Sequence, residues 1–148
     1  MTATPQPGSA NQLTALYRET IVRHAVNPTG YKEEIEATHL GELYNPLCGD
    51  RVVVHLKIHQ DRIEAMAFSG DSCAICTASA SLMCAQFSGT KTAELAGAHR
   101  WLKSALEGRD EPIAIEALTP LLGVRAYPSR VKCALLPWEA AEKAMTAD

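Results

Sequence analysis

The chain has 148 residues, a formal net charge of −3 and a hydrophobic fraction of 47%. This length suits one domain with one core, and the slightly acidic balance argues against a nucleic-acid partner, which normally requires a basic surface. No apolar run is long enough to span a bilayer, so no membrane partner is expected. Residues 1–12 contain no basic residue and no apolar stretch, and we expect a disordered tail there, followed by a single domain at 13–148.

The cysteines indicate the compartment and the kind of chemistry. There are five of them, at positions 48, 73, 76, 84 and 133. Without an export signal the protein is expected in the reducing cytoplasm, where disulfides are rare, and an odd count also argues against a disulfide framework. The thiols are therefore expected to be buried small hydrophobes, metal ligands or reactive groups.

The first expected element is a helix over residues 13–24, where apolar side chains recur at helical spacing before the Asn-Pro-Thr-Gly stretch at 27–30. Residues 35–43 are ambiguous. We favour a strand there, because the hairpin that follows would rarely be stable without a neighbour.

The hairpin is expected over residues 51–69. Apolar and polar side chains alternate along 51–59, which predicts a half-buried strand, and a second strand follows at 62–69. If His59 pairs with Arg62, the strands oppose three apolar pairs and one charge pair: Ile58 with Ile63, Leu56 with Ala65, Val54 with Ala67 and Lys57 with Glu64. This agreement fixes the predicted register.

The remainder of the chain favours helices. They are expected over 73–87, capped by Asp71 and Ser72, over 92–106, in a short segment near 115–122, and in a last helix with Pro128 in its first turn. Pro137 cannot donate a backbone hydrogen bond, so we expect it to bend the last helix or to begin a separate one. The expected fold class is α+β, a small antiparallel sheet of three strands packed against several helices.

The predicted register also gathers chemically useful groups at the open end of the hairpin. Extended outward, it places Cys48 opposite Cys73 and Asp50 opposite Asp71, with Cys48 and Asp50 on the face that the helices cover. Cysteine and carboxylate are ordinary zinc ligands, and a tetrahedral site needs four. Cys133, near the start of the last helix, is a suitable candidate for the fourth.

Three stretches resemble the signatures of the SufU/IscU family of iron–sulfur cluster assembly proteins, also called NifU N-terminal-like. They are Asn45-Pro46-Leu47-Cys48-Gly49-Asp50, Gly70-Asp71-Ser72-Cys73-Ala74 and Arg130-Val131-Lys132-Cys133-Ala134 with Trp138. The chain is more similar to the SufU type, because Lys132 precedes the last cysteine where an IscU scaffold carries histidine. The long stretch between Cys73 and Cys133 is also typical of SufU.

The resemblance implies a SufE/IscU-like fold and a zinc site made by Cys48, Asp50, Cys73 and Cys133. It implies that Cys48 accepts persulfide sulfur from a SufS-type cysteine desulfurase, with Arg130 as a supporting residue. The partners would be that desulfurase and downstream iron–sulfur assembly proteins. Such a protein is a sulfurtransferase-like accessory rather than a free-standing enzyme.

Three other functions remain open at this point. An IscU-type scaffold would bind iron or a nascent iron–sulfur cluster through Cys48, Cys73 and Cys133. A thiol–disulfide oxidoreductase would use the Cys73-Ala74-Ile75-Cys76 stretch, although Cys76, like Cys84, is more simply interpreted as a core residue. A purely structural zinc module would have a closed and inert site.

Overall fold

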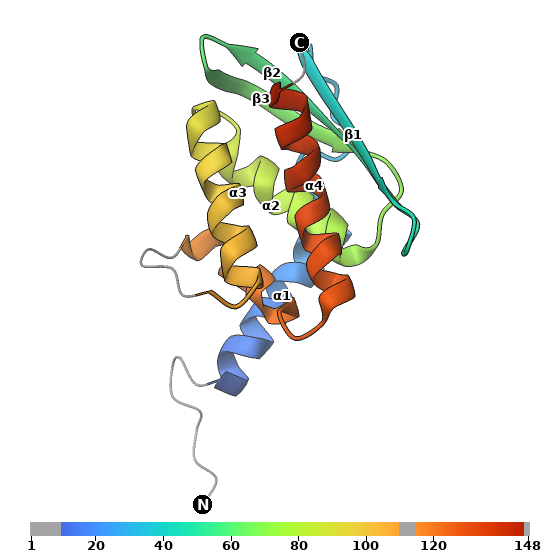
Figure 1. Cartoon of the computed structure of the whole chain (residues 1–148), viewed down its shortest axis with the longest axis vertical. Coiled ribbons are helices and arrows are strands. Elements are labelled where there is room, and N and C mark those ends of the chain that lie inside the picture. Colours follow the sequence, from blue (N-terminus) through green and yellow to red (C-terminus); the bar gives the residue numbers. More distant parts are fainter. Residues whose placement is uncertain (1–9, 110–114, 147–148) are drawn as a thin grey trace, which may run out of the picture.

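A computed structural model describes residues 10–109 and 115–146 of the chain, which form a three-stranded antiparallel sheet packed against helices (Figure 1). The elements are α1 (Ala10–Val26), β1 (His39–Asn45), β2 (Asp50–His59), β3 (Arg62–Ser69), α2 (Ala74–Phe87), α3 (Thr92–Leu106), the 3-10 helix η1 (Glu116–Val124) and α4 (Pro128–Thr146). The predicted α+β class is confirmed. Among these described helices, none is long and apolar enough to cross a membrane.

The first helix begins at Ala10 rather than at residue 13, and residues 1–9 of the expected tail lie outside the described residues. The ambiguous segment contains a true strand, β1, which pairs antiparallel with β2 along its whole length. The third strand of the sheet is therefore confirmed, although it starts and ends a few residues later than predicted.

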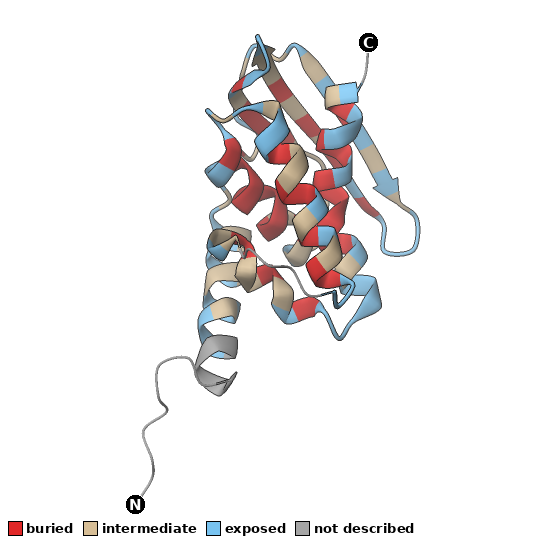
Figure 2. Cartoon of the chain, turned by 60° about the vertical axis from the view of Figure 1, so that its left-hand side comes forward, coloured by how far each residue is buried: buried red, intermediate tan, exposed pale blue. Residues whose placement is uncertain are grey.

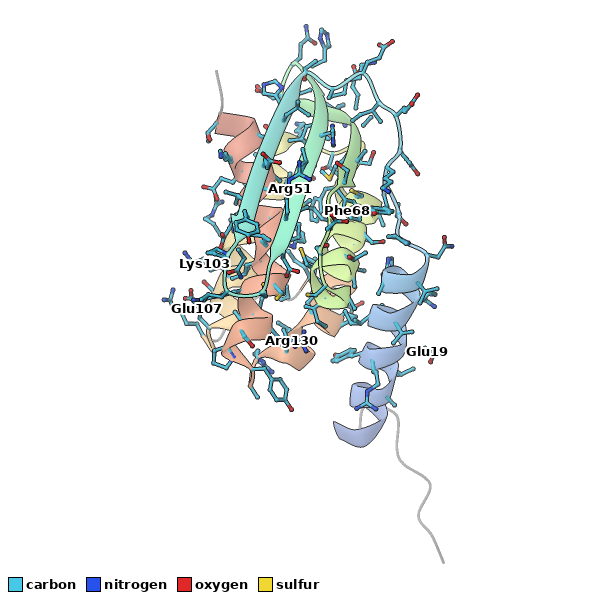
Figure 3. The ribbon with its side chains drawn as sticks, turned by 90° about the vertical axis from the view of Figure 1, so that its right-hand side faces the viewer. Glu19, Arg51, Phe68, Lys103, Glu107 and Arg130 are labelled. Atoms are coloured by element: carbon cyan, nitrogen blue, oxygen red, sulfur yellow. The ribbon has the colours of Figure 1, made fainter. Side chains whose placement is uncertain are left out.

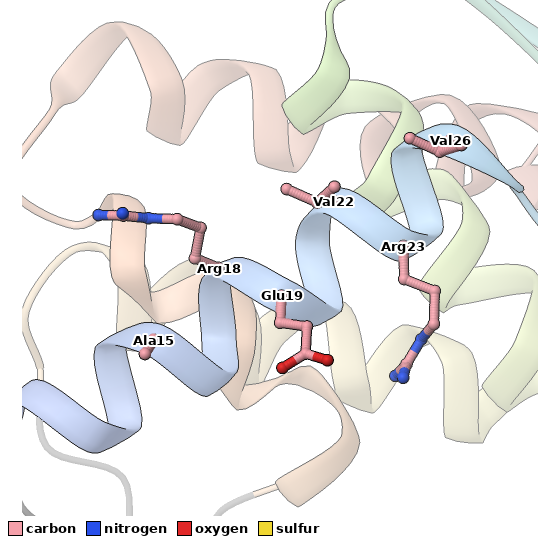
Figure 4. A pocket seen from close by; sticks show the side chains of 6 residues that line it. All are labelled: Ala15, Arg18, Glu19, Val22, Arg23 and Val26. Carbon is pink, nitrogen blue, oxygen red and sulfur yellow. The ribbon is translucent and has the colours of Figure 1, made fainter.

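One face of α1 remains open to solvent. Figure 4 shows Val22 and Val26 on this helix among Arg18, Glu19 and Arg23. The exposed fractions of Val22 and Val26 are 52% and 78%. The opposite side of α1 packs against α2 and η1.

The register of the central hairpin differs from the predicted one. His59 pairs with Arg62 and Ile58 with Ile63, as expected, but a bulge follows, and further along Leu56 lies opposite Met66 and Val54 opposite Phe68. The predicted pairing with Ala65 and Ala67 is wrong. The bulge turns larger apolar side chains towards the core, where alanine would leave volume unfilled.

The core lies between the sheet and the helices, where the buried residues gather in Figure 2. Val52, Val54 and Leu56 of β2 are fully buried there. Trp138 of α4 packs edge-on against Phe87 of α2, with ring centroids 5.7 Å apart. These contacts fix α2 and α4 on the inner face of the sheet.

Helix α4 runs without a break through Pro137, which is fully buried. The expectation that Pro137 begins a separate helix is wrong, because residues on both sides of it are held in the same core, among them Leu136 and Trp138. The proline still lacks the N–H that would reach the carbonyl of Cys133 four residues back. The expected bend stays a prediction.

Candidate metal centre

Cys48 and Asp50 lie where the chain turns from β1 into β2. Cys48 belongs to the turn at residues 46–49 and is exposed, whereas Asp50 is the first residue of β2 and only 3% exposed. Gly49 between them adopts a φ of +74°, in the left-handed region that glycine tolerates best. The turn brings the Cys48 thiol back to within 3.1 Å of the Asp50 carboxylate oxygen Oδ2.

Cys73 is the N-cap of α2. Its sulfur accepts a hydrogen bond from the Cys76 backbone N–H at 3.4 Å, so the cysteine caps the helix in place of the predicted Asp71 and Ser72. The predicted opposition of Asp50 to Asp71 is also wrong, because Arg51 N–H donates to the Asp71 carbonyl. Asp50 instead accepts a 2.7 Å hydrogen bond from the Cys73 backbone N–H, which ties the strand to the helix.

Cys133 reaches the same place from α4. Its side chain is 2% exposed, and its Sγ lies 3.8 Å from the Sγ of Cys48. Potential ligand atoms of Cys48, Asp50 and Cys133 all lie within 4.8 Å of one another. Cys73 adjoins this group, since its backbone N–H donates to the Asp50 carboxylate. The structure thus brings together the four predicted residues, three of them tightly.

The pKa values of Asp50 and Cys133 in this cluster are shifted in opposite directions. Burial by itself would raise the pKa of Asp50, but hydrogen bonds from the Cys48 thiol and the Cys73 backbone N–H hold that pKa below its usual value. Burial, together with hydrogen bonding to Asp50, raises the pKa of Cys133. The cluster therefore holds a carboxylate beside the buried Cys133 thiol, which keeps its proton unless a cation replaces it.

The donor set fits a zinc ion. Two thiols and a buried carboxylate converge from three different elements, and Cys73, whose backbone N–H donates to that carboxylate, adjoins them. Zinc takes four such ligands, and a thiol that binds it loses its proton. The same sulfur ligands also suit iron, so the geometry by itself is compatible with either metal.

Comparison with known proteins identifies the family. The NifU-like N-terminal domain pattern matches residues 16–147. The chain belongs to this family. The zinc-dependent sulfurtransferase SufU of Bacillus subtilis (strain 168) is 33% identical over 133 residues, which cover 88% of this chain and 90% of that protein. The iron–sulfur cluster assembly scaffold protein IscU of Streptococcus pyogenes serotype M1 is 30% identical over 137 residues, covering 91% and 86%.

Solved structures of the family share the fold. The N-terminal part of a NifU-like protein from Brucella abortus superimposes with a TM-score of 0.79 at 25% identity, covering 87% of this chain and 91% of that one. An iron–sulfur scaffold protein for the SUF system from Fervidobacterium islandicum AW-1 gives a TM-score of 0.76 at 29% identity, covering 93% and 100%. The resemblance to the SufU/IscU family is confirmed, and with it a general role in iron–sulfur cluster assembly.

Arg130, carried over as a supporting residue, lies in the first turn of α4, about one turn before Cys133 (Figure 3). It is exposed and lines a shallow groove with Ala74 and Ile75, which follow Cys73 at the start of α2. Arg130 therefore lies within one helical turn of Cys133 and is exposed to solvent.

Cys76 and Cys84 belong to the core, as predicted for both residues. Both are at most 2% exposed, and burial raises the pKa of each thiol to about 12. A buried thiol that keeps its proton is a poor nucleophile. The arrangement therefore disfavours a redox pair made by Cys73 and Cys76.

This difference in thiol environment predicts an order of modification. In the native, metal-stripped protein, iodoacetamide is expected to label Cys48 first and to leave Cys76 and Cys84 unlabelled until the protein unfolds. Peptide mass spectrometry of time points, with and without denaturant, measures the order. Native labelling of Cys76 as fast as that of Cys48 would restore the redox hypothesis.

Proposed function

We propose that this protein is a zinc-bound sulfur acceptor for a SufS-type cysteine desulfurase, and that Cys48 takes the sulfur. The observation that carries the proposal is the asymmetry of exposure within the cluster. Cys48 is exposed on a turn, whereas Asp50 and Cys133 are buried behind it. A partner can therefore reach one thiol of the site without opening the core.

The proposed transfer is a thiol–persulfide exchange. The Cys48 thiolate attacks the outer sulfur of the desulfurase persulfide, the sulfur–sulfur bond breaks, and the desulfurase cysteine leaves as a thiolate. One persulfide is consumed and one is formed on Cys48, so no external oxidant or reductant is needed. Bound zinc would supply a site in which the thiols are deprotonated at neutral pH.

The residues around Cys48 support this role. Asp50 is held in place by the Cys73 N–H, so its carboxylate stays beside the Cys48 thiol. Arg130, the proposed supporting residue, is exposed one helical turn before Cys133, and its cation would meet an acidic group of the docking enzyme. Cytoplasmic iron–sulfur assembly proteins would then receive the sulfur.

A second candidate function is an IscU-type scaffold that builds a cluster on Cys48, Cys73 and Cys133. It is favoured by the 30% identity to the Streptococcus pyogenes scaffold protein and by a donor set that suits iron as well as zinc. The two functions differ in what the purified protein carries, which is colourless zinc in the first case and a coloured, oxygen-sensitive cluster in the second.

Metal and sulfur analysis tests the proposal. We expect the protein, purified with and without oxygen, to hold about one zinc per chain, as a single tetrahedral site requires. After incubation with a SufS-type desulfurase and cysteine, mass spectrometry should find one added sulfur atom on the peptide that contains Cys48. Iron with acid-labile sulfide in the anaerobic protein, and no sulfur on Cys48, would favour the scaffold.

A further inference from the structure

Two serines of α2, Ser79 and Ser81, are completely buried, and each forms hydrogen bonds with a different neighbouring segment. Ser79 donates from Oγ to the backbone carbonyl of Ala134 in α4 and accepts a 2.8 Å hydrogen bond from the Trp138 indole N–H. Ser81 accepts a 2.7 Å bond from the Thr29 backbone N–H and lies 2.7 Å from His24 of α1. Each serine thus ties α2 to a different neighbouring segment.

The Ser79 bond reaches α4 directly beside a candidate ligand. Ala134 directly follows Cys133, and α2 is the helix whose N-cap is Cys73. The Ser79 hydroxyl therefore connects α2, which begins at Cys73, to the α4 backbone next to Cys133. A shift of α4 by a single residue along its axis would move Cys133 by about 1.5 Å, enough to spoil a metal site.

The backbone of α4 is weakened at this same turn. Pro137 has no N–H for the carbonyl of Cys133, so one intrahelical hydrogen bond is absent next to the ligand. The carbonyl of Ala134, the next along the chain, accepts a hydrogen bond from the buried Ser79 hydroxyl. The hydrogen bond from Ser79 thus restrains α4 close to the position where one of its intrahelical hydrogen bonds is missing.

We propose that Ser79 is a positioning residue for the metal centre: its hydrogen bond to Ala134 sets Cys133 against Cys48, Asp50 and Cys73. The inference rests on the proposed function, because it assigns Ser79 a role in metal binding. Ser79 does not touch the ligand atoms and acts through the backbone of α4. Residues of this kind around metal sites change affinity without being ligands.

The test compares two matched variants, Ser79→Ala and Ser81→Ala. Each removes one buried hydroxyl of equal size from the same helix, so both should lower the urea midpoint by a similar amount. Only Ser79→Ala should weaken zinc binding, by about tenfold or more in a chelator competition, whereas Ser81→Ala stays within about threefold of wild type. The visible bands of bound Co²⁺ should shift only in Ser79→Ala.

A third variant separates the Ala134 bond from the indole. Trp138→Phe removes the indole donor but leaves the Ser79 hydroxyl free to donate to Ala134, so its Co²⁺ spectrum should match that of wild type. Equal metal affinities and spectra in Ser79→Ala and Ser81→Ala, with wild type binding metal, would overturn this inference and leave the proposed function intact. A wild-type protein that binds neither Co²⁺ nor zinc would overturn both.

Discussion

Replacement of Cys48 by alanine is expected to abolish the stimulation of a SufS-type desulfurase, reducing alanine release from cysteine to the rate of the desulfurase alone. Cys48 is the exposed thiol of the cluster, whereas Cys133 is buried with a raised pKa and Cys73 is only partly exposed at the N-cap of α2. Zinc binding should also weaken, because one thiol ligand is lost. Alanine and sulfide release, measured at saturating cysteine, give the result.

Cys84→Ala is the matched control for that experiment. It also removes one thiol, but from the core near Gly30 rather than from the metal centre, and burial keeps that thiol protonated. Stimulation by Cys84→Ala should stay close to wild type once its folding has been confirmed by circular dichroism. Equal losses in the two variants would refute the assignment of Cys48 as the acceptor.

Gly41→Ala is expected to cost about 3 kcal/mol of unfolding free energy or more, the upper part of the range for overpacked cores. Gly41 lies in β1 directly beneath α4, and a Cβ there would stand 2.0 Å from the Ala140 carbonyl oxygen and 2.8 Å from the Ala144 backbone nitrogen. Both obstacles are backbone atoms, so the whole strand or helix must move. Urea unfolding followed by circular dichroism measures the loss.

Gly97→Ala is the control for the glycine substitution. Gly97 lies inside α3, and the only atom near an added Cβ is an Arg100 side-chain nitrogen at 3.8 Å, an ordinary contact. Alanine favours a helix over glycine by about 0.5–1 kcal/mol, so this variant should be as stable as wild type or slightly more stable. A Gly41→Ala protein with the urea midpoint of Gly97→Ala would contradict the close packing of β1 on α4.

Local pattern predicted the elements of this protein well. Alternation along 51–59 and 62–69 identified β2 and β3, and helical spacing and breakers identified α1, α2 and α3 within a few residues. These signals succeed because a strand repeats every two residues and a helix every 3.6, and both periods are visible in a short window. The residue types of the candidate site, thiols and a carboxylate, could likewise be read without a structure.

The pairing register of β2 with β3 could not be predicted from the local sequence pattern. The predicted pairs had apolar partners on one face and a favourable contact between Lys57 and Glu64, and that contact does form, at 3.6 Å. The bulge beside Lys57 nevertheless shifts the pairing by one residue, so that Met66 and Phe68 fill the space above β2. Which side chain fills a volume depends on the helices that enclose it, and the strand pattern alone contains no information about them.

The sequence by itself thus determined which residue types could bind a metal and which segments carry them. Only the tertiary structure decided how they meet: Cys48 on a turn instead of a paired strand, Cys73 as a helix cap, and Cys133 at 3.8 Å from Cys48 across 85 positions of chain. It also placed the buried Ser79 hydroxyl against the Ala134 carbonyl, a contact that joins α2 to α4. The physical reason is that propensity and periodicity act over one or two turns, whereas a site shared by three elements depends on how their buried faces pack.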